Sequence, residues 1–206
     1  DVLRRLGYPV KLEFTSIFPP EGGNLRPLSD VIGEKKNFQQ WIGIAPFAAH
    51  EGKILPTEKT EELIKEISRR HPSCRIFLFG GGEKEHAVLN AWCERYNNCT
   101  NASQALSSLK EEMVVMSHLD VMVSMDSGNM HLAAISGTRV ISVWGETHPY
   151  AGFLGWNQRP EDCIQADLPC RPCSIYGNKP CQRGDYACLT SIDPITIADK
   201  VDWSLN

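Results

Sequence analysis

The chain has 206 residues, of which 42% are hydrophobic and 22% are charged, and its formal net charge is −4. This is an ordinary composition for a folded globular domain, and it excludes the strongly basic footprint of nucleic-acid-binding domains. An apolar run of about 18 residues, which a membrane-spanning helix requires, does not occur. The first residue is Asp1 rather than Met, and the opening residues resemble the interior of a protein. We expect a fragment cut near a domain boundary, with a processed mature chain as the alternative.

The hydrophobic pattern is weak in residues 1–40, which we interpret as an interdomain linker and the edge of a missing amino-terminal domain. From Trp41 onward, short apolar runs that predict buried strands alternate with amphipathic stretches that predict helices. Strands are predicted at 41–45, 76–79, 121–124 and 140–144, and helices at 58–70, 83–96, 108–117 and 129–135. Beyond about residue 160 the pattern breaks into Pro, Cys and Gly, and no element is assigned there.

The order of these elements predicts the fold class. Strands that alternate with helices, and that are continuously apolar, are typical of a parallel sheet covered on both faces. We therefore predict a doubly wound, Rossmann-like α/β domain over residues 41–206. Ligands of such sheets bind beyond the carboxyl ends of the strands. The loops that follow Ala45, Phe79, Ser124 and Trp144 are therefore the places to look for a site.

The loop after the third predicted strand holds Asp126, Ser127 and Gly128, which end a strand and open a helix. Gly128 permits close approach of a ligand, and the unpaired N–H groups of a helix start suit a diphosphate. Ser127 adds a hydroxyl donor, whereas Asp126 is better suited to accept hydrogen bonds from sugar hydroxyls. The alternative is that Asp126 or Ser127 only caps the helix. His131 is either a ligand-binding group or, more ordinarily, a packed histidine that bonds to the backbone.

Two other loops hold charged residues of interest. Lys53 follows the first predicted strand and is able to neutralise a phosphate, although a solvated surface charge is the simpler interpretation. Glu83 and Glu85 follow the Gly-rich turn after the second strand, where a carboxylate often binds ribose hydroxyls. Their alternative role is to stabilise the helix N-terminus electrostatically. The turn itself lacks the dinucleotide-binding glycine pattern.

The cysteine-rich segment at 163–188 contains five of the eight cysteines of the chain. Cys170 and Cys173 have the spacing of half a zinc site, but Cys181 and Cys188 lack the paired spacing of a common second half. Free thiols, disulfides and a zinc site all stay open for these four residues. The remainder of the sequence looks cytosolic, a setting in which thiols usually stay reduced.

Several of these segments together resemble glycosyltransferase family 9, the lipopolysaccharide heptosyltransferases. The resemblance spans roughly residues 40 to 190, and its most specific part is the Asp126–Ala134 segment. The matching segments are Ile42–Pro46 with Lys53, the Gly80–Gly81 turn, the helix start at Ser107–Leu109, Asp126–Ala134, Trp144–Pro149 and Cys170–Cys173. The family has the GT-B fold of two Rossmann-like domains that face a cleft. This chain resembles the carboxyl-terminal domain, which binds the nucleotide sugar.

The resemblance implies a role for each matching residue. Lys53 and Asp126 would be catalytic, with Lys53 neutralising the departing phosphate and Asp126 orienting the sugar. The donor-binding set would be Ser107, Ser108, Glu83, Glu85, Ser127, Gly128, His131 and Thr147. Among these, the serine pair would contact the base, one of the two glutamates the ribose, Ser127 and Gly128 the diphosphate, and Thr147 would lie at the cleft rim.

The implied reaction is inverting sugar transfer from ADP-heptose, or a related nucleotide sugar, to a lipopolysaccharide core acceptor. The base would lie in the missing amino-terminal domain, so the fragment alone would be inactive. No metal or other cofactor is expected, and the location would be cytoplasmic, with peripheral attachment at the inner membrane. The alternatives are a UDP-sugar epimerase of similar architecture and a non-catalytic, zinc-stabilised interaction domain.

Overall fold

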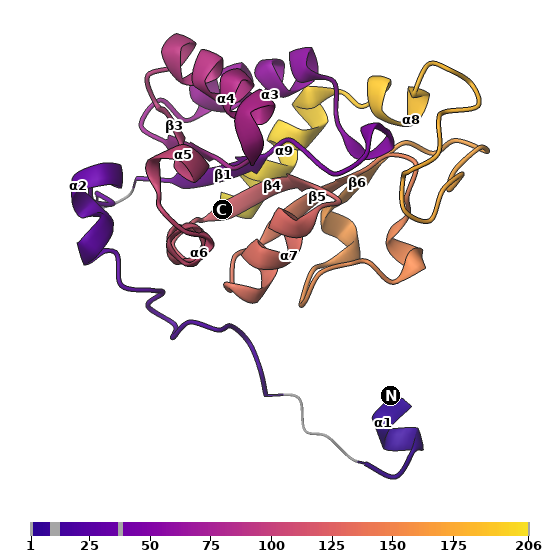
Figure 1. Ribbon diagram of the computed structural model, residues 1–206, viewed down its shortest axis with the longest axis horizontal. Helices are drawn as coiled ribbons and strands as arrows, with labels where there is room; N and C mark the ends of the chain where they lie inside the picture. Colours follow the sequence, from indigo (N-terminus) through magenta and orange to yellow (C-terminus); the bar gives the residue numbers. More distant parts are fainter. Residues whose placement is uncertain (1, 9–12, 37–38, 206) are drawn as a thin grey trace.

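The structure is a computed structural model that describes residues 2–8, 13–36 and 39–205. Its centre is a sheet of six parallel strands in the order β3-β2-β1-β4-β5-β6. The strands are β1 (Trp41–Ala45), β2 (Arg75–Leu78), β3 (Cys99–Asn101), β4 (Val121–Met125), β5 (Val140–Trp144) and β6 (Cys163–Gln165). This confirms the predicted doubly wound α/β fold class, in which helices cover both faces of a parallel sheet (Figure 1).

The three central strands are buried along their whole length. All five residues of β1, of β4 and of β5 are buried. Successive side chains of a strand point to opposite faces, so a continuous apolar run contributes to the core on both sides of the sheet. Ile42 and Ile44 therefore pack on one face, and Trp41 and Ala45 pack on the other.

Each face of the sheet has its own layer of helices (Figure 1). One apolar core lies beneath α3 (Thr57–Arg70), α4 (Gly82–Arg95) and α9 (Pro194–Leu205). The other lies beneath α2 (Ser29–Ile32), α5 (Ala102–Ala105), α6 (Leu109–Met116) and α7 (Gly128–Ile135). Two further short helices are α1 (Val2–Arg5) and α8 (Ala187–Thr190). None of the helices in the described ranges combines the length and the apolar character that crossing a bilayer requires.

Several elements depart from the pattern that the sequence predicted. The strands β3 and β6 at the two sheet edges were not predicted, and neither was α9. The expectation that regular structure ends near residue 160 was therefore wrong. Part of the predicted linker also belongs to the body of the domain, because Leu28 and Ile32 are buried in the core.

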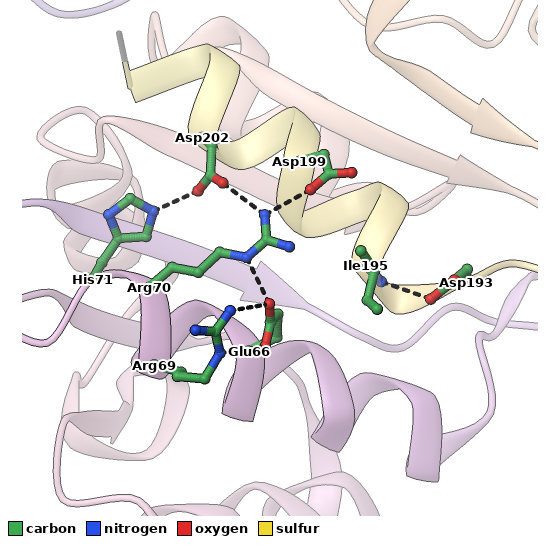
Figure 2. A network of polar contacts seen from close by, with 8 residues as sticks. All are labelled: Glu66, Arg69, Arg70, His71, Asp193, Ile195, Asp199 and Asp202. Carbon is green, nitrogen blue, oxygen red and sulfur yellow. Dashed lines mark hydrogen bonds and ion pairs between the residues drawn. The ribbon is translucent and has the colours of Figure 1, made fainter.

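The helix α9 is anchored to α3 by a network of charged side chains (Figure 2). The Arg70 guanidinium donates to Asp199 at 2.7 Å and to Asp202 at 2.6 Å, both on α9, and to Glu66 on its own helix at 2.7 Å. His71 Nε2 lies 2.7 Å from Asp202 Oδ1. The hydrogen bond from Arg69, which has the larger effect, and the one from Arg70 lower the pKa of Glu66 to about 2.

We expect Arg70→Ala to lower the free energy of unfolding by about 1 kcal/mol, since three charge-assisted hydrogen bonds at a partly exposed site are lost. Urea unfolding checks this, with Lys65→Ala, at an exposed position of the same helix, as the matched control. An acid of lowered pKa stabilises the fold above its ordinary pKa of 4.5, and this contribution disappears as the pH falls toward 2. The free energy of unfolding should therefore fall less on acidification in Glu66→Gln than in the parent. The same dependence of unfolding free energy on pH in both proteins would contradict the role of the network.

Candidate functional site

The strand order of the sheet reverses between β1 and β4, which are neighbours in space although β2 and β3 lie between them in the sequence. In doubly wound sheets the crevice at such a reversal, outside the carboxyl ends of the strands, is the usual ligand site. Here it is bordered by the loops that follow β1, β4 and β5. Lys53 lies in the first of these loops, Asp126 in the second and Thr147 in the third.

The structure brings these three side chains into direct contact. Lys53 Nζ lies 3.0 Å from Asp126 Oδ2, and the Thr147 hydroxyl donates to the same oxygen at 2.8 Å. The Lys53 side chain is only 15% exposed and that of Asp126 only 4%. Lys53 is therefore not the solvated surface charge of the simpler interpretation. Thr147 is fully buried, so its expected place at the rim of the cleft was wrong.

Close packing of glycines holds the loops after β1 and β5 together. A Cβ on Gly145 would lie 2.3 Å from the carbonyl oxygen of Gly52, so only glycine fits at this crossing. The backbone N–H of Glu146 donates to that same carbonyl at 2.8 Å. Because Gly52 precedes Lys53, the crossing fixes the start of the lysine side chain relative to the Thr147 loop.

The N-terminus of α7 lies beside this cluster, because α7 begins two residues after Asp126. Ser127 is the N-cap residue, yet its side chain makes no capping hydrogen bond. Its hydroxyl lies instead 3.3 Å from the Ser124 hydroxyl. The interpretation of Ser127 as a side-chain cap was therefore wrong. Gly128 is exposed and a Cβ there would meet no atom within 4 Å, so the helix start is open to an approaching ligand.

His131 is exposed on the outer side of α7, whereas Met130, Ala133 and Ala134 face the core. The interpretation of His131 as a packed histidine was therefore wrong. It lies one helical turn beyond Gly128, and a role in donor binding stays a prediction for it.

The remaining predicted donor-binding residues lie after β2 and β3. Glu83 is exposed in the first turn of α4, and Glu85 accepts a hydrogen bond from the Gly81 N–H at 2.7 Å. Ser108 caps α6 by accepting from the Glu111 N–H at 3.3 Å, while the Glu111 carboxylate accepts from the Ser107 N–H and hydroxyl at 2.7 and 2.8 Å. This pattern resembles a capping box, but the glutamate accepts from the residue before the N-cap rather than from the N-cap N–H itself. Contacts of these residues with a base or a ribose stay predictions.

The cysteine-rich segment contributes residues to the site that sequence reasoning missed. The Arg171 guanidinium donates to the carbonyl oxygens of Trp144, Gly145 and Thr147, with distances of 3.2, 2.5 and 3.0 Å. Gly177 is buried against Lys53, and a Cβ there would lie 2.5 Å from Lys53 Cγ. The segment thus covers the Lys53 stem and secures the Thr147 loop. No local motif around Arg171 or Gly177 signals these long-range contacts.

Glu146 is a second residue that sequence reasoning missed. It is fully buried, and neither of its carboxylate oxygens has a hydrogen-bond partner among the described residues. Burial raises the pKa of this carboxyl group, and the nearby charge of Glu51 raises it further. The sequence did contain a signal for Glu146, because it lies just after a buried strand and inside the Trp144–Pro149 segment that resembles the family.

The cysteines form no disulfide in the described part of the chain, and all eight are free thiols. No group of three His, Cys, Asp or Glu residues within that part is arranged to hold a metal ion. Partial desolvation raises the pKa of the exposed Cys173, and burial raises that of Cys188 to about 11. These two thiols are therefore mostly protonated and poorly nucleophilic at neutral pH.

Comparison with known proteins gives one consistent result for most of the chain. The profile of glycosyltransferase family 9 (heptosyltransferase) matches residues 26–181. A lipooligosaccharide heptosyltransferase 2 of Campylobacter jejuni is 22% identical over 172 residues, which cover 80% of this chain and 51% of that protein. The chain thus spans about half the length of the curated relatives it matches.

Two solved structures share the fold at low sequence identity. The glycosyl transferase family 9 protein of Veillonella parvula has a TM-score of 0.73 and 16% identity, covering 99% of this chain and 57% of that one. The Escherichia coli heptosyltransferase WaaC, solved with ADP, has a TM-score of 0.61 and 18% identity, covering 98% of this chain and 53% of that one.

Proposed function

Because this chain belongs to glycosyltransferase family 9, we propose that it is the donor-binding, carboxyl-terminal half of a heptosyltransferase-like enzyme. The observation that carries this proposal is the contact of both Lys53 and Thr147 with Asp126 at the strand-order reversal, beside the open N-terminus of α7. A cation and a set of free helix N–H groups at one place suit a diphosphate. The acidic Asp126 beside them suits the hydroxyls of an attached sugar.

The proposed donor is ADP-heptose or a closely related nucleotide sugar. Support comes from the E. coli relative that was solved with ADP and from the heptosyltransferases among the curated relatives. The names of those relatives also support a lipopolysaccharide core as the acceptor. We place the reaction in the cytoplasm, at the inner-membrane face where such an acceptor would be built. Neither a UDP-sugar epimerase nor a zinc-stabilised interaction domain has support from the family match.

In the proposed reaction an acceptor hydroxyl attacks the anomeric carbon of the donor sugar. The bond from that carbon to the phosphate oxygen breaks with inversion, and ADP leaves with the electron pair. A base on the amino-terminal half takes the proton of the acceptor hydroxyl. Lys53 and the N–H groups at the start of α7 stabilise the charge that develops on the leaving diphosphate. Asp126, itself held by the Thr147 hydroxyl, positions the lysine ammonium and accepts from the sugar hydroxyls.

This proposal predicts binding without turnover for the isolated chain. Isothermal titration calorimetry should show that the chain binds ADP, and a transfer assay with ADP-heptose and a lipopolysaccharide core acceptor should show no product. Adding the amino-terminal half, as a longer form of the same protein, should restore transfer. Sugar transfer by the isolated chain would contradict the placement of the catalytic base on the amino-terminal half. A failure to bind ADP would contradict the donor site itself.

A substitution at Gly128 separates ligand contact from folding. A Cβ at this position meets no atom within 4 Å, and alanine favours a helix start over glycine, so Gly128→Ala should leave the thermal unfolding midpoint unchanged or slightly higher. A diphosphate seated on the helix N-terminus approaches the backbone closely, so ADP affinity should fall about tenfold, or about 1.4 kcal/mol. The matched control is Gly81→Ala, which also adds a methyl group in open space. Equal ADP affinity in Gly128→Ala and the parent would exclude close contact at this point.

A further inference from the structure

A separate cavity lies at the opposite end of the strands from Lys53. Its volume is about 430 Å³, within the range of small-molecule sites. It is bordered by the segment 15–20, the carboxyl end of α7, the residues that precede β5 and the loop 156–162. These elements meet at the amino ends of the strands, whereas Lys53, Asp126 and Thr147 follow the carboxyl ends.

Three residues of the cavity wall each carry a buried polar atom that has no hydrogen-bond partner in the described part of the chain. These groups are the Ser136 hydroxyl, the Trp156 indole N–H and the Gln158 amide nitrogen. Ser136 is only 3% exposed. Buried polar groups in native proteins almost always have a partner, so three such groups around one cavity indicate something that the cavity binds.

The chemistry of these groups defines the partner. The indole nitrogen of Trp156 is only a donor. The orientation of the Gln158 amide follows from its oxygen, which accepts from the Gly155 N–H at 2.9 Å and leaves the NH₂ end unpaired. Two of the three groups are therefore pure donors, and the serine hydroxyl is able to act as a third. A ligand for this wall has to be rich in acceptor atoms.

The charges around the cavity favour an anion. The Asp162 carboxylate lines the wall, but both of its oxygens accept from the Arg139 guanidinium, each at 2.9 Å. This bidentate pair is electrically balanced. Arg159 also lines the wall, and its side chain has no ion pair within the described ranges, so a net positive charge remains. Further serine and threonine hydroxyls complete the wall and suit the hydroxyl groups of a sugar.

From this combination we propose that the cavity is a binding site for a small phosphorylated sugar. Its phosphate accepts from Arg159 and, once their side chains turn toward the cavity, from the covered nitrogens of Trp156 and Gln158. Its ring hydroxyls exchange hydrogen bonds with Ser136 and the other wall hydroxyls. The site does not depend on the donor site, because no residue of the Lys53 cluster lines it.

The test follows the indole N–H resonance of Trp156 in ¹H–¹⁵N spectra of the whole chain, which has five tryptophans, with Trp156→Phe assigning the peak. Glucose 6-phosphate should shift this resonance in the parent and equally in Lys53→Ala, which excludes the donor site as the place of binding. Glucose and inorganic phosphate should each bind at least tenfold more weakly. Equal binding of glucose would overturn the phosphate contact, and equal binding of inorganic phosphate would overturn the sugar contact.

The decisive variant is Gln158→Glu. It keeps the shape and the acceptor for the Gly155 N–H but replaces the donor NH₂ by a carboxylate oxygen, so affinity for glucose 6-phosphate should fall at least tenfold. Gln182→Glu, at an exposed position, is the matched control and should bind like the parent. ADP titration of both variants verifies that they are folded. Unchanged binding by Gln158→Glu, or no shift of the Trp156 resonance with any of the three probes, would overturn the proposal.

Discussion

Lys53→Ala should reduce the affinity of the chain for ADP by about 10- to 100-fold. The variant loses charge-assisted hydrogen bonds to the diphosphate, each of which contributes about 1.5–3 kcal/mol. The same change leaves the Asp126 carboxylate buried with Thr147 as its remaining side-chain donor. Stability should therefore fall as well, by about 3 kcal/mol, because an uncompensated buried charge is costly. Calorimetry with ADP and thermal unfolding measure the two effects separately.

Two controls separate the loss of a ligand contact from a loss of stability. Lys35→Ala breaks another lysine–aspartate pair, with Asp120 at 2.8 Å, and should leave ADP binding intact. Asp126→Asn also breaks the Lys53 pair but leaves the lysine charge free for the diphosphate. It should therefore retain ADP affinity while it weakens binding of an ADP-sugar. ADP affinity that is equal in Lys53→Ala and the parent would exclude the role given to Lys53.

Gly145→Ala should damage both the fold and the site, although it adds only a single methyl group. That methyl group would lie 2.3 Å from the Gly52 carbonyl oxygen and within 2.9 Å of Leu189. A backbone oxygen cannot rotate away, so the loops after β1 and β5 have to separate. We expect a loss of about 1–3 kcal/mol in the free energy of unfolding, as for other overpacked sites.

The same displacement should lower ADP affinity about tenfold, because a small shift of Lys53 away from Asp126 misplaces the ammonium group. Urea unfolding and ADP calorimetry on one preparation measure both quantities. Gly81→Ala, where the added methyl group meets nothing within 4 Å, should change neither. Normal ADP binding by a destabilised Gly145→Ala would mean that the loop crossing supports the fold but not the position of Lys53.

The central part of the fold was predictable because its strands carry their own signal. The predicted bounds of β1 and β5 match the structure, since both are continuous apolar runs that end at a clear boundary. The edge strands β3 and β6 have three residues each and carry little apolar character. Their strand conformation depends on pairing with β2 and β5, and a local pattern does not contain that information.

The helix α9 was missed although its start carries a local signal. Asp193 accepts from the Ile195 N–H at 2.9 Å, and Pro194 occupies the first helical position. An N-cap aspartate followed by proline is a typical helix start. The Cys- and Pro-rich character of the preceding segment masked it.

For the candidate site, the sequence predicted which loops border it. All strands of a parallel sheet point the same way, so the loops that follow them lie at one end of the sheet. It did not predict that Lys53 and Thr147 both contact the Asp126 carboxylate. It also did not predict that Arg171 and Gly177 cover this cluster. Those contacts depend on how the cysteine-rich segment folds back, which is a property of tertiary packing.

The reversal of strand order also has a consequence for synthesis on the ribosome. The neighbour of β1 on one side is β4, which emerges only after β2 and β3 have been made. Roughly 70 residues separate Lys53 from Asp126, so at about 5–20 residues per second several seconds pass before the lysine has its partner. During that interval β1 exposes an unpaired, apolar edge of the kind that promotes aggregation. The strand order that creates the crevice thus leaves the nascent chain open to aggregation through β1 until β4 has been synthesised.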